Sequence, residues 1–521
     1  MDKTCKDTSK QLETYLKQSG GCGRYQILLA ITIHSMKCLV NFSMLFFMFG
    51  SAVPDWWCTD DMPYKNITMS VHLPQYKTCY VGNSSSICQK IQFDDTMNTV
   101  VKEWNLVCDM QWIPYLLTSI QMVGILFGNI VCGQLADLFG RKPPFLISYA
   151  VLILSHVGAA FSTSWTMGAV FWFLVGAGCG FFLTLQYSIM TEYSLIKWRT
   201  WLIAMPSWEI ESILFALVAW LVKDWRYIHG ICAVIGFPLL IVYCCVGMES
   251  FRWYVSHDRI QDARTVIEKV AKINKSSTPD LSDLNIEQDD LKDKKYTPLD
   301  LVRNRSLLVY TLAFIFIWIN LGLSTYGLQF GVSALSGNLY INIFAIGLIG
   351  VPLRFVSIFG RKKAATLFNA ISVLAAFAVA IEYRFEETSF RNKLTNASAL
   401  ISLIAIHQIW SPIQTLTVEL YPTVVRNIAF GFHNSMTRVG AVIGPQLVFL
   451  DTKFAGSMYW ICACTTLISA LLILPLPETK ERDLPDKIIA RTDDRVDNLS
   501  SDESNTEEKE CLRKSPDKMT C

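Results

Sequence analysis

The chain has 521 residues, of which 52% are hydrophobic and only 17% are charged. Soluble domains carry about 25% charged residues, so this composition excludes an ordinary soluble enzyme. The 46 basic and 44 acidic residues leave a net charge of +2, and no basic block is interleaved with aromatic residues. Nothing in the charge therefore indicates binding to nucleic acid, and the expected partners are the lipid bilayer and small solutes.

Hydrophobic runs dominate the chain. A bilayer core of about 30 Å needs about 20 apolar residues per helix, and twelve runs approach that length. They begin near Ile27, Trp112, Phe145, Met167, Thr200, Ile228, Leu307, Asn338, Ala364, Ala397, Asn427 and Phe454. The runs predict an all-α membrane protein with twelve transmembrane helices.

Basic residues indicate the orientation, because Lys and Arg stay on the cytoplasmic side. They follow the even-numbered runs, at Arg141, Lys142, Lys197, Arg199, Arg361, Lys362, Lys363 and Arg426. Both termini are then cytoplasmic, and the polar start of the chain predicts no cleaved signal peptide. The expected parts are a cytoplasmic N-terminus (1–25), a first six-helix half (26–248) with an extracellular loop (51–111), a cytoplasmic linker (249–305), a second six-helix half (306–477) and a disordered cytoplasmic tail (478–521).

The extracellular loop carries four cysteines, Cys58, Cys79, Cys88 and Cys108. Four thiols in an oxidising compartment are disulfide candidates with three alternative pairings. The loop also carries two glycosylation acceptors, at Asn66 and Asn83. No cysteine or histidine spacing in the chain predicts a metal site.

Three landmarks recur at nearly one offset, which predicts that the two halves arose by duplication. Gly140-Arg141-Lys142 matches Gly360-Arg361-Lys362 after 220 residues, Glu192 with Arg199 matches Glu419 with Arg426 after 227, and Glu249 matches Glu478 after 229. We expect these residues, at equivalent ends of the two halves, to take part in gating.

The longest motif is the decapeptide Gly133-Gln134-Leu135-Ala136-Asp137-Leu138-Phe139-Gly140-Arg141-Lys142. Gly133 is expected to permit a close helix approach, and Gly140 a tight turn. Asp137, at the end of a span, is expected to pair with Arg141 or with a neighbouring helix N-terminus. A contact of this kind can form in one conformation and break in another.

This decapeptide resembles the signature loop of the major facilitator superfamily, and other motifs narrow the resemblance to the solute carrier 22 family of organic ion transporters. These motifs are Pro54-Asp55 with Cys58, Glu103 to Cys108, Asp224-Trp225-Arg226, Glu249 to Trp253, Glu419 to Asn427 and Pro477 to Lys480. Two features depart from the family: residues 354–361 lack the acid expected before Gly360-Arg361, and the outer loop has four cysteines where six are common.

The resemblance implies the major facilitator fold, secondary transport by alternating access at the plasma membrane, and a substrate cavity between the halves. It implies no cofactor. Coupling to Na+ or H+, exchange for a counter-substrate and the oligomeric state stay open.

Ionisable residues inside the hydrophobic runs are costly and therefore mark candidate binding sites. Arg438 lies near the middle of the eleventh run, and in the family an Arg at this position typifies the anion and zwitterion branches. A guanidinium can hold a carboxylate through two hydrogen bonds, whereas the alternative role of Arg438 is an ion pair with a membrane acid.

Lys37 is a second candidate cation, or a partner for Glu209 or Glu211. These two acids are two residues apart and cannot share one helix face, so one is expected to line the cavity and the other to pair.

Aromatic and polar side chains complete the candidate site. Trp318, Tyr326, His407 and Gln408 are the expected contacts for an organic ion, with Trp208 and Trp410 as further aromatic walls. Aromatic faces supply apolar area and can meet a cation, although packing and interfacial roles are the alternative for each.

The sequence thus predicts a transporter of small organic ions, foremost organic anions or carnitine-like zwitterions. The alternative is an organic cation transporter of the same fold that uses Glu209 or Glu211. A channel or a sensor built on the transporter fold is the alternative from a different class. An enzyme or a nucleotide-driven pump is not expected, because the chain contains no GxxxxGK[ST] loop.

Overall fold

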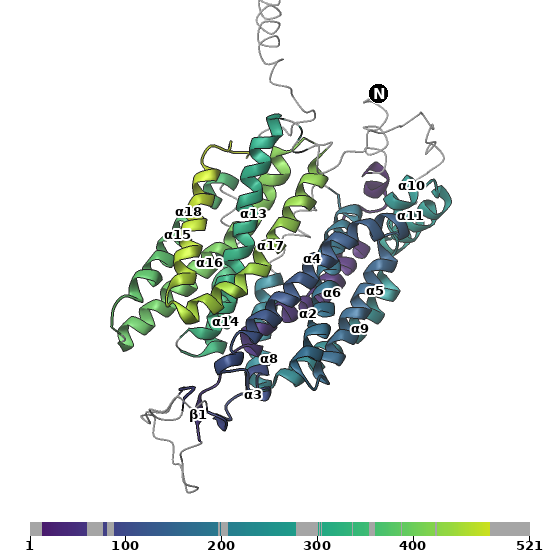
Figure 1. Ribbon diagram of the computed structural model, residues 1–521. Coiled ribbons are helices and arrows are strands. Elements are labelled where there is room, and N and C mark those ends of the chain that lie inside the picture. Colours follow the sequence, from purple (N-terminus) through teal and green to yellow (C-terminus); the bar gives the residue numbers. More distant parts are fainter. Residues whose placement is uncertain are drawn as a thin grey trace, which may run out of the picture.

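The computed structural model describes residues 13–59, 77–80, 88–195, 198, 207–277, 301, 303, 305–335, 337–353, 360–386, 388–422 and 425–479. Helices make up most of these residues and form two packed groups (Figure 1). The first group contains α2 (Arg24–Gly50), α4 (Ile113–Phe139), α5 (Lys142–Ala160), α6 (Trp165–Tyr193), α8 (Ser207–Val222) and α9 (Trp225–Val246). The second contains α13 (Arg305–Gly331), η2 (Val332–Ala334), α14 (Leu339–Leu353), α15 (Arg361–Glu382), α16 (Ser389–Leu420), α17 (Arg426–Lys453) and α18 (Ser457–Ile473).

Many of these helices are long and apolar enough to cross a membrane. Within the described part of the chain, eight stretches meet both conditions: Arg24–Gly50, Cys108–Phe139, Lys142–Ala160, Trp165–Tyr193, Trp225–Val246, Leu307–Ala334, Arg361–Glu382 and Ser389–Leu420. Leu339–Leu353 and Ser457–Ile473 are shorter apolar helices. The chain is therefore a multi-pass membrane protein, and the full set of twelve predicted spans stays a prediction.

Caps and glycine turns fix where several helices begin. The hydroxyl of Ser164 accepts a hydrogen bond from the Met167 amide, 3.3 Å away, at the start of α6. The Asp224 carboxylate accepts one from the Arg226 amide, 2.8 Å away, at the start of α9. The predicted tight turn at Gly140 is present, because this residue has φ +93° directly before α5.

Glycines also set how closely the helices of each group pack. A Cβ atom on Gly124 or Gly128 of α4 would lie 2.1 Å or 2.3 Å from a backbone oxygen of α6. In the second group, a Cβ on Gly440 of α17 would lie 2.0 Å from the Ile319 oxygen of α13. The prediction that Gly133 permits a close approach was wrong, since nothing lies within 4 Å of its Cβ position. The close contact instead involves glycines five and nine residues earlier on the same helix.

Gly128→Ala is expected to destabilise the folded protein, whereas Gly133→Ala is tolerated. The added methyl group at Gly128 meets backbone that cannot move aside, and overpacking of this kind costs about 1–3 kcal/mol. The measurement is the thermal melting temperature of both variants and the parent chain in detergent. Equal melting temperatures for the two variants would contradict this description of the α4–α6 contact.

A small disulfide-linked unit lies at one end of the bundle, which we call the β1 end (Figure 1). The strand β1 (Trp56–Cys58) pairs antiparallel with β2 (Ile91–Phe93), followed by α3 (Val100–Glu103) and η1 (Cys108–Met110). The four predicted cysteines form the bonds Cys58–Cys88 and Cys79–Cys108, which is one of the three pairings left open. The acceptors Asn66 and Asn83 lie outside the described residues.

Glu103 ties this unit to the bundle. Its carboxylate accepts hydrogen bonds from Trp225 Nε1 at 2.6 Å and from Arg226 Nε at 2.9 Å. Two of the motifs that carry the family resemblance, far apart in the sequence, are therefore in direct contact.

The opposite end of the bundle, which we call the α10 end, carries two short helices from the predicted linker, α10 (Phe251–Ser256) and α11 (Ile260–Asn274) (Figure 1). The apolar face of α11 is buried, and Asn274 accepts a hydrogen bond from the Tyr25 amide at 2.8 Å. The linker thus begins as a folded extension of the first group. Residues 278–300 of the predicted linker and the predicted disordered tail beyond Thr479 lie outside the described residues.

Candidate functional site

A cavity of about 140 Å³ lies between the two helix groups. Helices α2, α6 and α8 line it from the first group, and α13, α16 and α17 from the second. The predicted site residues that line it are Lys37, Glu209, Tyr326, His407 and Arg438, together with Trp208 and Trp410. Glu211, Trp318 and Gln408 are not among the lining residues.

Arg438 brings a positive charge to this cavity from α17. Its residue is only 5% exposed, and its Nη1 donates to the Tyr326 hydroxyl at 3.0 Å. With the Asn129 amide turned so that its oxygen faces the guanidinium, that oxygen accepts from Arg438 Nε at 3.2 Å. Within the described part of the chain, no carboxylate forms an ion pair with Arg438. Neutral oxygens therefore hold the guanidinium in place while its charge is left without a counter-charge.

Lys37 has a different environment. Its Nζ lies 3.9 Å from Glu211 Oε1, donates to the Ser207 hydroxyl, and sits 5.9 Å from the centre of the Trp208 ring. Of the alternatives for Lys37, the structure shows the ion pair with Glu211. Glu209, two residues earlier on α8, lines the cavity instead. The two acids of α8 thus take the two different environments that their spacing predicts.

Two predicted contacts have structural partners away from the cavity lining. Trp318 is fully buried, and its Nε1 donates to the Thr417 hydroxyl at 3.1 Å. Gln408 Nε2 donates to the Gly350 carbonyl at 3.4 Å. Both residues pack the second group, so direct contact with a substrate is not their role in this conformation.

Uncharged polar side chains in the lining were missed by the sequence analysis. They include Gln186, Thr325, Gln329, Gln414 and Asn434. Spacing in the sequence could have identified some of them. Asn434 lies four residues before Arg438, and Thr325 lies four residues before Gln329, so each pair shares one helix face.

At the β1 end, the two groups close against each other through α4 and α17. The Ser119 hydroxyl donates to the Val442 carbonyl at 2.8 Å, and Gln446 Nε2 donates to the Ser119 oxygen at 2.9 Å. The rings of Tyr115 and Phe449 lie 5.7 Å apart. These contacts lie between the cavity and the β1 end, so they separate the cavity from that side.

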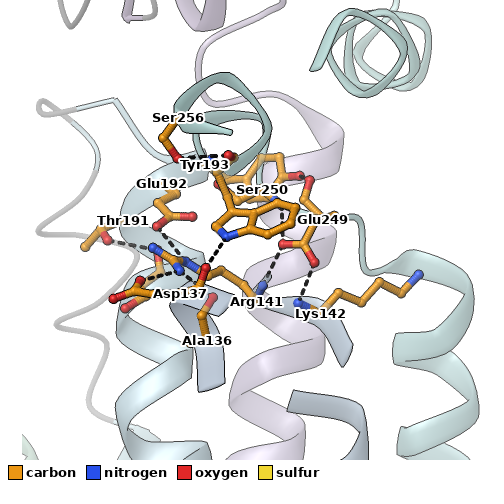
Figure 2. Close-up of polar contacts among 12 residues, drawn as sticks. Ala136, Asp137, Arg141, Lys142, Thr191, Glu192, Tyr193, Glu249, Ser250 and Ser256 are labelled. Atoms are coloured by element: carbon orange, nitrogen blue, oxygen red, sulfur yellow. Dashed lines mark hydrogen bonds and ion pairs between the residues drawn. The ribbon is translucent and has the colours of Figure 1, made fainter. Parts of the chain in front are cut away.

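At the α10 end, the predicted gating residues of the first group form a cluster (Figure 2). Arg141 Nη1 lies 2.8 Å from Asp137 Oδ1, and Arg141 Nε lies 3.2 Å from Glu192 Oε1. The Glu249 carboxylate accepts from the backbone amides of Arg141 at 2.7 Å and Lys142 at 3.0 Å. Glu249 therefore caps the start of α5, where the helix dipole favours a negative charge.

The second group repeats this arrangement. Arg361 Nη2 lies 3.3 Å from Glu419 Oε1, and the Glu478 carboxylate accepts from the Arg361 and Lys362 amides at 3.1 Å and 3.3 Å. Arg426 Nε donates to the Tyr421 carbonyl at 3.2 Å. Arg199 and residues 354–359, where an acid equivalent to Asp137 would fall, lie outside the described residues. The recurring residues that the structure describes in both groups thus occupy equivalent places.

Comparison with known proteins gives the family. A family model described as "Sugar (and other) transporter" matches residues 67–487. Solute carrier family 22 member 4 of Mus musculus is 30% identical over 413 residues, which cover 76% of this chain and 72% of that protein. The chain belongs to the solute carrier 22 family. It is therefore a major facilitator transporter and not an enzyme, as the sequence predicts.

Other relatives match over longer stretches. The organic cation transporter protein of Drosophila melanogaster is 28% identical over 517 residues, covering 90% of this chain and 92% of its own length. Solute carrier family 22 member 6 of Danio rerio is 26% identical over 531 residues, with 91% and 92% covered.

Solved structures support the fold. The inward open conformation of the xylose transporter XylE from E. coli superposes with a TM-score of 0.58 at 14% identity, covering 87% of this chain and 98% of that one. This likeness shows the major facilitator fold.

Proposed function

We propose that this solute carrier 22 member is a plasma-membrane secondary transporter of small organic anions and zwitterions. One observation carries the proposal: Arg438 is buried, lines the cavity, and has no carboxylate partner in the described part of the chain. A buried charge without a counter-charge is costly, so a substrate that brings a carboxylate gains from meeting it.

The geometry of Arg438 suits this role. A guanidinium carries five N–H donors, and the contacts with Tyr326 and Asn129 use only two of them. The remaining donors can bind a carboxylate through two hydrogen bonds. Tyr326 and Asn129 then act as supports that fix the plane of the guanidinium before the substrate arrives.

The rest of the lining favours a zwitterion. Glu209 supplies a negative charge from the first group, and the Trp208 and Trp410 rings supply aromatic faces that attract a cation. Lys37 does not add to the positive charge, because Glu211 offsets it. A relative named "Organic cation/carnitine transporter 2" fits this arrangement, since carnitine carries both a quaternary ammonium group and a carboxylate.

The second candidate is an organic cation transporter of the same fold, which the position of Glu209 and the names of several relatives favour. In that case Glu209 is the counter-charge of the substrate and Arg438 has a structural role. A channel or a sensor without a carrier cycle remains the alternative from a different class, which an exchange experiment separates.

The proposed orientation places the β1 end outside and the α10 end in the cytoplasm, with twelve membrane spans and both termini cytoplasmic. The two disulfides at the β1 end support this, because they need an oxidising compartment. The basic residues Arg141, Lys142, Arg361 and Lys362 at the α10 end support it as well. In this orientation the α4–α17 contacts lie on the outer side of the cavity.

Uptake into cells that express the chain tests the proposed function. The panel contains labelled organic anions, carnitine-like zwitterions and quaternary cations, each measured with and without Na+ and at two external pH values. We expect saturable uptake of substrates with a carboxylate, accelerated by preloading the cells with unlabelled substrate. Uptake of cations alone would favour the second candidate, and uptake without acceleration by preloading would favour a channel.

A further inference from the structure

Two neighbouring cysteines at the end of α9 are exposed on the outer surface of the helix bundle. Cys244 and Cys245 are both exposed, as are Ile241 and Val242 one turn earlier, whereas Tyr243 between them is fully buried. The thiols therefore lie on the face of α9 that points away from the protein. In a membrane, this face contacts lipid.

Contacts with the α10-end cluster fix the depth of these thiols. Lys142 Nζ donates to the Cys244 carbonyl at 3.4 Å, and a lysine ammonium must reach the headgroup level of the bilayer. Glu249, which caps α5, follows only four residues after Cys245. The two thiols are thus within about one helix turn of the membrane surface.

The other free cysteines of the described residues do not combine these properties. Cys132, Cys179, Cys232 and Cys462 are buried, and Cys22 and Cys38 are partly buried. Cys464 is exposed, but it lies seven residues from the nearer end of α18, which is about 10 Å along the helix. Cys464 therefore has the same lipid exposure at a different depth, which makes it a matched control.

We propose that Cys244 and Cys245 are sites of reversible S-acylation by long-chain fatty acyl groups. Cysteines beside a membrane surface suit this chemistry, because the attached chain enters the bilayer without crossing protein. The thiol sulfur attacks the carbonyl carbon of a fatty acyl-coenzyme A thioester. A new carbon–sulfur bond forms, the bond to coenzyme A breaks, and coenzyme A leaves as a thiol with the proton from cysteine. No group is oxidised or reduced.

The attached chains would anchor the end of α9. Each CH₂ group that enters the bilayer strengthens membrane binding, and Phe237 and Ile241 already expose an apolar path along the helix. Because α9 packs on α2 and α5, the anchor acts on the first helix group.

Capture of thioester-linked cysteines tests the proposal on the full-length chain in cell membranes. Free thiols are blocked, thioesters are cleaved with neutral hydroxylamine, and the released thiols are labelled with a maleimide that adds a visible mass. We expect up to two added labels on the parent chain and on the Cys464→Ser variant. The double variant Cys244→Ser with Cys245→Ser is expected to lose both labels.

Three results would overturn the proposal: no hydroxylamine-dependent labelling, labelling that persists in the double variant, or release by a reducing agent alone, which indicates a disulfide. The inference depends on the proposed orientation, which a separate measurement checks. After hydroxylamine treatment, a membrane-impermeant maleimide added from the cytoplasmic side should reach Cys244 and Cys245. Reaction only from outside would reject the orientation, whereas cytoplasmic reaction without prior thioesters would reject S-acylation alone.

Discussion

Replacing Arg438 with glutamine is expected to reduce uptake of a carboxylate substrate by about 100-fold or more. Truncating one partner of a buried charge pair costs about 2–5 kcal/mol, and about 1.4 kcal/mol corresponds to a factor of ten. Glutamine is neutral and cannot form the two parallel hydrogen bonds of a guanidinium. The measurement is the initial uptake rate at low substrate concentration, divided by the amount of transporter at the cell surface.

Lys37 and Glu211 provide the control for this experiment. Because they pair with each other, the double variant Lys37→Gln with Glu211→Gln removes no net charge from the cavity. We expect it to keep most of its carboxylate uptake, while Tyr326→Phe, which removes only one hydrogen bond to Arg438, loses about tenfold or less. Full uptake by Arg438→Gln, or an equal loss in the double variant, would show that Arg438 does not bind the carboxylate.

Replacing Glu249 with alanine is expected to lower transport at least about tenfold and to reduce thermal stability. The change removes the carboxylate that accepts from the amides of Arg141, Lys142 and Ser250, so the start of α5 loses its cap. Hydrogen bonds to a charged group contribute about 1.5–3 kcal/mol each to stability. Water that binds the freed amides offsets part of this loss. Uptake rate and melting temperature are measured on the same preparations.

Asp137 is the matched control for Glu249, because both acids contact Arg141. The Asp137 side chain is 77% exposed, and exposed ion pairs contribute about 0–1 kcal/mol. Asp137→Asn should therefore have a much smaller effect on stability than Glu249→Ala. Glu478→Ala in the second group should resemble Glu249→Ala, since Glu478 caps α15 in the same way. A larger loss in Asp137→Asn than in Glu249→Ala would contradict the capping role.

The positions of the helices could be predicted well because apolar run length is a strong signal. Predicted starts near Ile27, Trp112 and Asn427 fall within three residues of the observed helix starts. The largest difference is α16, which begins at Ser389 and not near Ala397. Its first turns contain Arg391, Asn392 and Lys393, and polar residues that extend a helix beyond the apolar run are invisible to a search for apolar residues.

For the site, sequence predicted which charges matter but not which way neutral side chains point. Arg438 and Glu209 could be found because a charge within a membrane span is costly and therefore marks a candidate binding site. Trp318 and Gln408 could not be separated from lining residues, because their direction depends on packing against Thr417 and Gly350. The close helix contact was predicted at Gly133 but is found at Gly128. The motif gives no information about which face of the helix meets a neighbour.

The α4–α17 contacts at the β1 end are formed by neutral groups. The contacts between α4 and α17 described above join hydroxyl, amide, carbonyl and aromatic groups, none of which carries a formal charge. Dissolved salt screens interactions between exposed charges but has little effect on neutral hydrogen bonds. In the proposed orientation, the strength of these hydrogen bonds should therefore depend little on the ionic strength of the external medium.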